Sequence, residues 1–142
     1  MSFVQTAISR SFVAKLPYGA DLLNSIKDVA AKAKIHSASF TAIGAVRKAK
    51  VSYYDQTEKK YNTLEFNEPM EIVSCIGNIS ESNGKMIVHA HLLLSDEKGR
   101  AFGGHLQEGT DLFACELMMD EYENLRITRK YDQLTGLNLM EI

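Results

Sequence analysis

Short runs of apolar and β-branched residues, separated by brief polar turns, follow one another along most of this 142-residue chain. Such runs are typical of β-strands, and turns too short for a crossover require neighbouring strands to be antiparallel. The one amphipathic helical pattern begins after Asp21, a good N-cap, and ends near Lys34. The sequence therefore predicts an α+β fold. We expect a single domain, residues 1–142, with a bent, mainly antiparallel sheet of about seven or eight strands and one helix packed on it.

The segments with strand character are 8–16, 37–46, 48–55, 61–66, 70–79, 86–94, 101–106, 112–119 and 125–131. Gly44 lies inside one of them, which marks a bulge or a close approach of two backbones. The C-terminal tail, 132–142, carries five apolar residues. A tail of this composition is expected to pack on the core or on a neighbouring subunit.

Charge and cysteine usage narrow the function classes. The formal net charge is −2 and the sequence pI is about 6.1, whereas nucleic-acid binders usually carry a basic surplus. The basic clusters at 47–50, 59–60 and 126–130 are expected to be solvated strand ends or turns. Neither a secretory signal nor a membrane-spanning run is present in the sequence, so cytoplasmic residence is expected. Cys75 and Cys115 are predicted to be buried thiols rather than a disulfide or metal ligands.

Three of the four histidines lie close together in the sequence: His89, His91 and His105. Residues two apart on a strand point to the same face, so His89 and His91 would project side by side. The turn that follows returns the chain towards His105. Pairing His91 with His105 implies a three-residue loop, 97–99, whose last residue is glycine. A bulge at Gly103-Gly104 is the alternative way to aim His105.

Three imidazoles that converge from two strands form a site for zinc or another divalent transition metal, with a position left for a further ligand. Both faces of the 86–94 strand carry apolar residues, so both are expected to be largely buried. The alternative is that the histidines are structural and bind carbonyls and carboxylates. Glu116 is expected either to orient a ligand imidazole or to point outward. His36, just past the helix, is expected to be structural rather than a ligand.

Several short motifs follow one another in a fixed order. They are Ala42-Ile43-Gly44-Ala45, Tyr53-Tyr54-Asp55, Glu68-Pro69-Met70-Glu71-Ile72, Gly77-Asn78-Ile79-Ser80, His89-Ala90-His91, Ser95-Asp96, Gly99 and Gly103-Gly104-His105-Leu106. Together they resemble the plants-and-prokaryotes-conserved (PPC) domain family, and the resemblance covers roughly residues 8–130.

The resemblance implies a strongly bent antiparallel sheet, assembly as a homotrimer, and a metal-binding triad at His89, His91 and His105. Prokaryotic members are often labelled DNA-binding proteins by similarity. Plant members add an AT-hook with an Arg-Gly-Arg-Pro core, which this chain lacks. The resemblance thus implies a metal-binding regulatory or interaction module, with nucleic acid as one partner.

The same three histidines also support a second interpretation. Three neutral imidazoles with one open position are typical of metal-dependent hydrolases and lyases that act on small molecules. No G-x-S-x-G, P-loop, dinucleotide or H-E-x-x-H motif accompanies them. The sequence therefore leaves the enzyme and the binding module as open alternatives.

Overall fold

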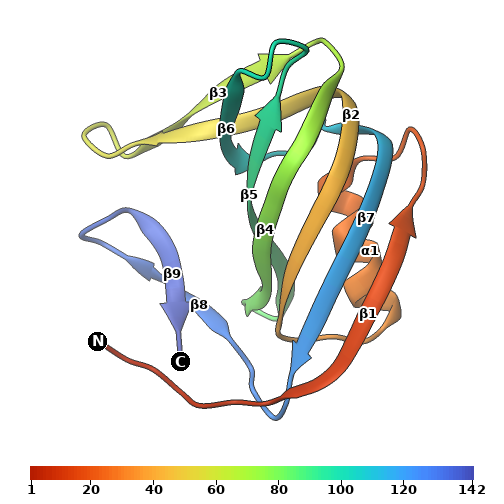
Figure 1. Cartoon of the computed structure of the whole chain (residues 1–142). Coiled ribbons are helices and arrows are strands. Elements are labelled where there is room, and N and C mark those ends of the chain that lie inside the picture. Colours follow the sequence, from red (N-terminus) through yellow and green to blue (C-terminus); the bar gives the residue numbers. More distant parts are fainter.

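The computed structural model describes all 142 residues and contains nine strands and one helix (Figure 1). The strands are β1 (Ile8–Leu16), β2 (Ala38–Asp55), β3 (Lys60–Phe66), β4 (Met70–Ser82), β5 (Lys85–Ser95), β6 (Ala101–Leu106), β7 (Asp111–Tyr122), β8 (Thr128–Asp132) and β9 (Leu137–Glu141), and the helix is α1 (Leu22–Lys32). All strands belong to one sheet, and only the bridge between β4 and β8 is parallel. The predicted α+β fold is confirmed, with nine strands in place of seven or eight.

Strand β2 bends the sheet, because its two halves have different partners. Residues 38–46 pair with β4 on one side and β7 on the other, whereas residues 49–55 pair with β3 and, at two positions, with β6. Since β4 pairs with β5 and β5 with β6, strands β2, β4, β5 and β6 close a circuit. The sequence predicts separate strands at 37–46 and 48–55. The chain instead continues through Arg47 as one strand, because β7 still pairs with it at Lys48.

Helix α1 covers one face of the sheet and closes the core (Figure 1). Asp21 caps its first turn by accepting a hydrogen bond from the backbone N–H of Asn24 at 2.9 Å, as the sequence predicts. Leu22, Ile26 and Ala30 are fully buried, and burying each of the two larger side chains contributes about 2 kcal/mol. The structure contains no helix with the length and apolar character needed to cross a lipid bilayer.

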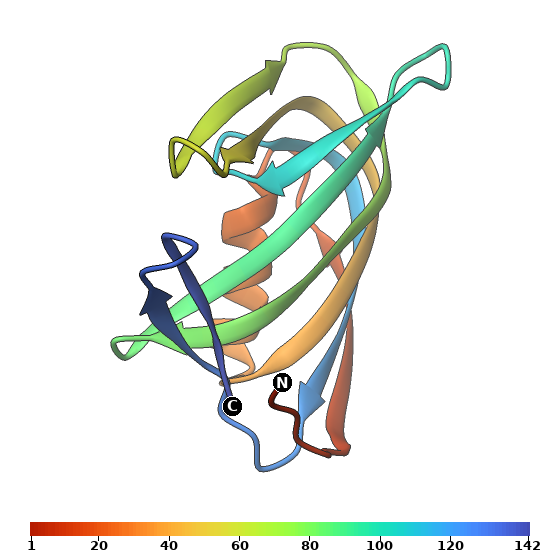
Figure 2. The same ribbon diagram turned by 90° about the vertical axis from the view of Figure 1, so that its left-hand side faces the viewer.

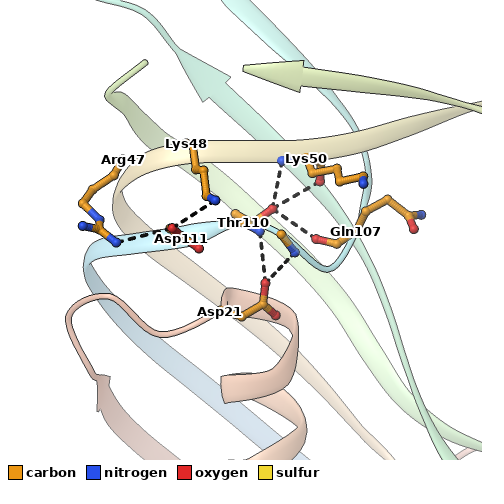
Figure 3. Close-up of polar contacts among 8 residues, drawn as sticks. Asp21, Arg47, Lys48, Lys50, Gln107, Thr110 and Asp111 are labelled. Carbon is orange, nitrogen blue, oxygen red and sulfur yellow. Dashed lines mark hydrogen bonds and ion pairs between the residues drawn. The ribbon is translucent and has the colours of Figure 1, made fainter. Parts of the chain in front are cut away.

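A polar network fixes the loop between β6 and β7 to the rest of the molecule (Figure 3). The carboxylate of Asp21 accepts hydrogen bonds from the backbone N–H groups of Gly109 (2.8 Å) and Thr110 (3.0 Å). The fully buried Thr110 hydroxyl accepts from the N–H of Lys50 and lies within donating distance of the carbonyls of Lys50 and Gln107. The loop is therefore tied to both α1 and β2, which holds the end of β6 in place.

Two hairpins project from the sheet on the side away from α1, and Figure 2 shows them facing each other. The upper one joins β2 and β3, and the lower one joins β8 and β9, so the C-terminal tail is a paired strand. The hairpins touch. The hydroxyl of Tyr54 donates to the carbonyl of Thr135 at 2.7 Å, and the ammonium of Lys59 donates to that of Gln133 at 3.0 Å.

Candidate metal centre

Strands β5 and β6 form the hairpin that brings the three histidines together. His91 lies directly opposite His105 across the strand pair, so the first of the two alternatives left open by the sequence, direct pairing through a three-residue loop, is the one observed. Gly99 closes the loop with a φ of +74°, the left-handed conformation that a three-residue hairpin loop requires at its last position. The carboxylate of Asp96 stabilises the turn by accepting from the N–H groups of Lys98 and Arg100, both at 2.9 Å.

Gly103 and Gly104 must be glycines because β6 packs closely between β5 and β2. A Cβ at Gly103 would collide with the carbonyl oxygen of Leu92 on β5. A Cβ at Gly104 would lie 2.7 Å from the carbonyl oxygen of Ser52 on β2. The β5–β6 register runs through both glycines without a shift. The alternative of a bulge at Gly103-Gly104 is therefore wrong, and close packing on both sides explains the Gly-Gly-His motif.

The three imidazoles face one another at the distances of a cluster. Their ring centroids are 5.0 Å apart for His89 and His105, 5.5 Å for His89 and His91, and 5.6 Å for His91 and His105. One nitrogen of each ring can be chosen so that all three lie within 4.8 Å of one another. Nitrogens that share a tetrahedral zinc with bonds of roughly 2.1 Å are about 3.4 Å apart. Coordination would therefore require the rings to turn inward.

The surroundings of His89 and His105 favour the neutral form of these two rings, which is the form that a metal needs. Burial, with smaller effects from Arg129, His105 and His91, lowers the pKa of His89 to about 4. Burial, followed by the charges of His91 and Arg129, also lowers the pKa of His105. Neutral imidazoles are the form that binds transition metals. A set of three imidazole nitrogen donors, two of them on rings whose pKa is lowered, therefore fits a divalent transition metal such as zinc.

Arg129 of β8 lies against this cluster. Its guanidinium donates to the Ser80 hydroxyl at 2.8 Å, the side-chain oxygen of Asn78 at 2.9 Å, the backbone carbonyl of Asn138 at 3.1 Å and Nδ1 of His89 at 3.2 Å. All four acceptors are neutral. Arg129 makes no ion pair, and burial lowers its pKa. The sequence prediction that cluster 126–130 is solvated is wrong for this residue, because β8 folds back across β4.

The bond from Arg129 fixes the tautomer of His89. Arginine only donates, so Nδ1 of His89 must be unprotonated and Nε2 must carry the ring proton. A metal on Nδ1 would take the lone pair that Arg129 uses. A metal on Nε2 would move the proton to Nδ1, where it would face the guanidinium. Whichever nitrogen binds a metal, this hydrogen bond must break.

A cavity of about 270 Å³ opens in front of His89 and His105, between the two hairpins. Its lining residues are Tyr61, Ser82, Ile87, Val88, His89, His105, Arg129, Gly136, Leu137, Asn138 and Leu139. The Tyr61 ring also contacts that of His105, with centroids 5.3 Å apart. None of the lining residues is acidic. The cavity therefore combines metal-type donors, one cation and apolar walls without a carboxylate.

The prediction that both faces of β5 are buried holds for one face only. Ala90, Leu92 and Leu94 point into the core. His91 is exposed, and Leu93 beside it is 42 % exposed. No element of the chain covers this part of the face turned away from α1. The cluster is thus half-buried on the side of the cavity and open on the side of His91.

The remaining candidate residues lie elsewhere. Glu116 is exposed on β7, opposite Ile43, and is not a cavity-lining residue. It points outward, the second of its two predicted positions. His36 is half-exposed and pairs with Glu81 at 2.9 Å, outside the cluster. Cys75 and Cys115 are free and buried, and burial raises the pKa of their thiols to about 12 and about 11.

Sequence reasoning did not find Arg129 and Tyr61, because both reach the site from distant strands. A signal for the arginine exists in Asn78 and Ser80, two polar residues that point to the same face of β4. Their side chains require partners once they are covered. The sequence alone does not indicate which residue supplies them.

Comparison with known proteins places these features in a family. Among solved structures, the metal-containing protein AF0104 from Archaeoglobus fulgidus is 37% identical, with a TM-score of 0.94 over 100% of both chains. A plant- and prokaryote-conserved (PPC) protein from Pyrococcus horikoshii is 33% identical, with a TM-score of 0.92 over 100% of this chain and 98% of that one. A protein of Ralstonia eutropha JMP134 with a provisional DNA-binding name is 26% identical, with a TM-score of 0.83 over 92% and 90% of the two chains.

The curated relatives are much longer proteins. The bifunctional protein GlmU of Synechococcus sp. strain JA-3-3Ab is 27% identical over 133 residues, which are 92% of this chain and 20% of that protein. The chain thus spans about a fifth of the length of the curated relatives it matches. The model of the Plants and Prokaryotes Conserved (PCC, also written PPC) domain matches residues 4–123. The chain belongs to this family.

Proposed function

We propose that this protein binds zinc through His89, His91 and His105 and holds a small molecule beside the metal. The observation that carries the proposal is that the three rings form a cluster that adjoins a cavity. The similarity to a metal-containing protein over the whole chain supports it. A zinc ion with three histidine ligands and an open position acts as a Lewis acid on a molecule next to it. The chain's own contribution would be to position that molecule with Arg129 and the apolar walls.

Metal analysis of untagged protein tests the metal assignment. The wild type is expected to retain about one zinc per chain after dialysis against zinc and buffer exchange. The His105→Ala variant is expected to retain little. His36→Ala is the matched control, because it removes an imidazole that lies outside the cluster. Equal zinc content in all three proteins would contradict the proposal.

The cavity favours a small-molecule site over a purely structural metal. A structural zinc site uses four protein ligands, and here three histidines converge without a carboxylate or thiol among them. Metal-dependent chemistry on that molecule, of a hydrolase or lyase type, is the enzyme form of this proposal. It would have to proceed without a carboxylate base from the cavity wall. Turnover that depends on zinc and is lost in His105→Ala would distinguish the enzyme from a binding module.

Assembly as a homotrimer is supported by the sheet surface turned away from α1, which we name the outer face. A row of directly paired residues crosses it from Val13 through Met118, Thr41 and Ile76 to His91. The apolar residues of this face, each at least 38 % exposed, are Val13, Ile43, Val73, Ile76, Leu93 and Met118. Exposed apolar residues that recur on one face across several strands are typical of an interface.

Light scattering coupled to size-exclusion chromatography tests the assembly. The wild type is expected to elute with three times the mass of one chain. Ile43→Asp, in the middle of the outer face, is expected to shift the mass to that of a monomer. Leu134→Asp adds the same charge on the exposed turn of the lower hairpin and should leave the trimer intact. A monomeric wild type at micromolar concentration would contradict this part of the proposal.

Nucleic acid is the less favoured partner, because the basic clusters carry acidic neighbours. Arg47 and Lys48 both pair with Asp111 (Figure 3), at 3.3 and 3.4 Å. Lys50 pairs with Glu65 at 3.3 Å. Lysines and arginines neutralised in this way contribute less to phosphate binding. Fluorescence anisotropy with a labelled duplex at 50 mM salt is expected to show no binding, and a salt-dependent affinity would restore the nucleic-acid interpretation.

We place the protein in the cytoplasm, since both cysteines are free and buried, which agrees with a reducing compartment.

A further inference from the structure

We infer that the cavity beside the histidine cluster binds a small organic carboxylate through Arg129, and that this anion and the metal strengthen each other's binding. The inference rests on the proposed function, because it concerns the same site. Four features of the cavity carry it: an uncompensated cation, one free donor with a second that metal binding would free, apolar walls, and a hydrogen bond that metal binding must break.

The first feature is the charge balance. Arg129 is partly buried, makes no ion pair, and donates only to neutral acceptors. None of the cavity-lining residues is acidic. Burying a cation without a counter-charge is costly. A divalent metal on three neutral imidazoles would add two further positive charges. An anionic ligand is therefore the complement that the protein itself does not provide.

The second feature is the number of free donors on the guanidinium. Arginine has five N–H groups. One on Nε serves Ser80, one on Nη1 serves Asn138, and the two on Nη2 serve Asn78 and His89. One donor on Nη1 is thus left over. When the bond to His89 breaks, one on Nη2 becomes available as well. A carboxylate has two oxygens at the spacing of these two nitrogens and forms such bidentate pairs readily.

The third feature distinguishes an organic carboxylate from an inorganic anion. The cavity walls around the polar centre include Ile87, Val88, Leu137 and Leu139. These side chains would contact the hydrocarbon part of a ligand whose charged end lies on Arg129. With about 270 Å³, the cavity is smaller than the pockets that bind drug-sized molecules. A carboxylate with a short branched chain, such as isovalerate, suits these dimensions.

The fourth feature couples the two ligands. The bond from Arg129 to Nδ1 of His89 cannot coexist with a metal on either ring nitrogen. A carboxylate that accepts from this donor replaces the bond to His89. The metal then binds to His89 without having to break that hydrogen bond. By thermodynamic linkage the metal must then raise the affinity for the carboxylate by the same factor. The tautomer of His89 is thus the element that both ligands bias.

Calorimetric titrations of metal-stripped protein test the inference. Isovalerate is the probe, and its uncharged amide, isovaleramide, and inorganic phosphate are the comparison ligands. We expect zinc to bind at least about fivefold more tightly in the presence of saturating isovalerate, with little effect of the amide. We also expect the zinc-loaded protein to bind isovalerate more tightly than phosphate. Amide and carboxylate that bind equally well would overturn the inference.

Variants of Arg129 separate the contribution of its charge from that of its hydrogen bonds. Arg129→Gln should bind isovalerate about tenfold more weakly or worse, bind zinc at least as well as the wild type, and lose the coupling. Arg129→Lys keeps the charge but not the paired N–H donors of the guanidinium, and it should recover part of the isovalerate affinity. Arg126→Gln is the matched control, because that arginine is 64 % exposed and faces Glu81. Unchanged coupling in Arg129→Gln would also overturn the inference.

The outcomes separate the inference from the proposed function. If the wild type binds no zinc, the proposed function fails. If zinc binds with His105-dependent stoichiometry and isovalerate neither binds nor alters the zinc affinity, the inference alone fails. Circular dichroism of Arg129→Gln checks its folding. If that variant does not fold, the wild-type comparison of isovalerate with isovaleramide decides the matter without it.

Discussion

The carboxylate of Asp21 holds two parts of the molecule together, and removing it should have a measurable cost. One oxygen caps helix α1 through the N–H of Asn24, and the other accepts from the N–H groups of Gly109 and Thr110. Loss of an N-cap costs about 1 kcal/mol. Each of the two loop hydrogen bonds contributes about 1 kcal/mol. We therefore expect Asp21→Ala to lower the free energy of unfolding by about 3 kcal/mol.

Asp21→Asn separates the two roles. The amide oxygen can still cap the helix, but the amide nitrogen would face the two loop N–H donors. We expect this variant to lose about 2 kcal/mol, the contribution of the two loop bonds. Asp28→Ala is the control, because Asp28 lies on the exposed side of the same helix without a polar partner. Its effect should stay within about 0.5 kcal/mol.

Urea unfolding followed by circular dichroism measures these differences, at one protein concentration and with a chelator present. In thermal scans the Asp21→Ala midpoint should fall by roughly 6–12 °C. A wild-type-like stability of Asp21→Asn would refute the reasoning, because the loop bonds would then contribute nothing. An equal loss in Asp28→Ala would show that the effect comes from helix charge rather than from these three contacts.

Three further outcomes follow from the site. Gly104→Ala should lose about 2 kcal/mol of stability and bind zinc more weakly, because its Cβ would be 2.7 Å from the Ser52 carbonyl; unchanged urea midpoints would contradict this. The metal-free protein should lose stability as pH falls from about 6.5 towards 4. In this range His89 is protonated in the unfolded chain but stays neutral in the folded protein, where its pKa is lowered to about 4. His89→Gln should flatten this dependence of stability on pH. A profile identical to that of the wild type would show that His89 does not cause it. Zinc added to metal-free protein should raise the melting temperature of the wild type but not of His105→Ala.

Local sequence patterns predicted those elements whose contacts join residues close together in the chain. The cap at Asp21 and the apolar spacing after it predict α1, because helix bonds connect neighbours in the chain. Gly99 and the distance from His91 to His105 predict the hairpin register, since a short loop fixes the pairing of its strands. Gly44 indicates a close approach, and the structure places it against the backbone of Ala114 at a shift in register.

The features that the sequence could not predict depend on distant partners. Strand β2 continues through Arg47 because β7 pairs with it on both sides of that residue, at Val46 and Lys48, and no residue near Arg47 encodes that partner. The exposure of His91 depends on which face α1 covers, and an alternation of residues does not distinguish the two faces. Arg129 reaches His89 across 40 residues through a single parallel bridge between Glu81 and Thr128.

The contact between the two hairpins has a consequence for the order in which the molecule assembles. His91 and His105 come together in a hairpin with one short turn. The two hairpins are joined by the hydrogen bonds Tyr54–Thr135 and Lys59–Gln133, which connect residues 81 and 74 positions apart. Contacts of long sequence separation require larger loops to close and form late. During synthesis all three histidines leave the ribosome before Arg129 does, so a metal ion can meet its ligands before the arginine that competes for His89 has emerged.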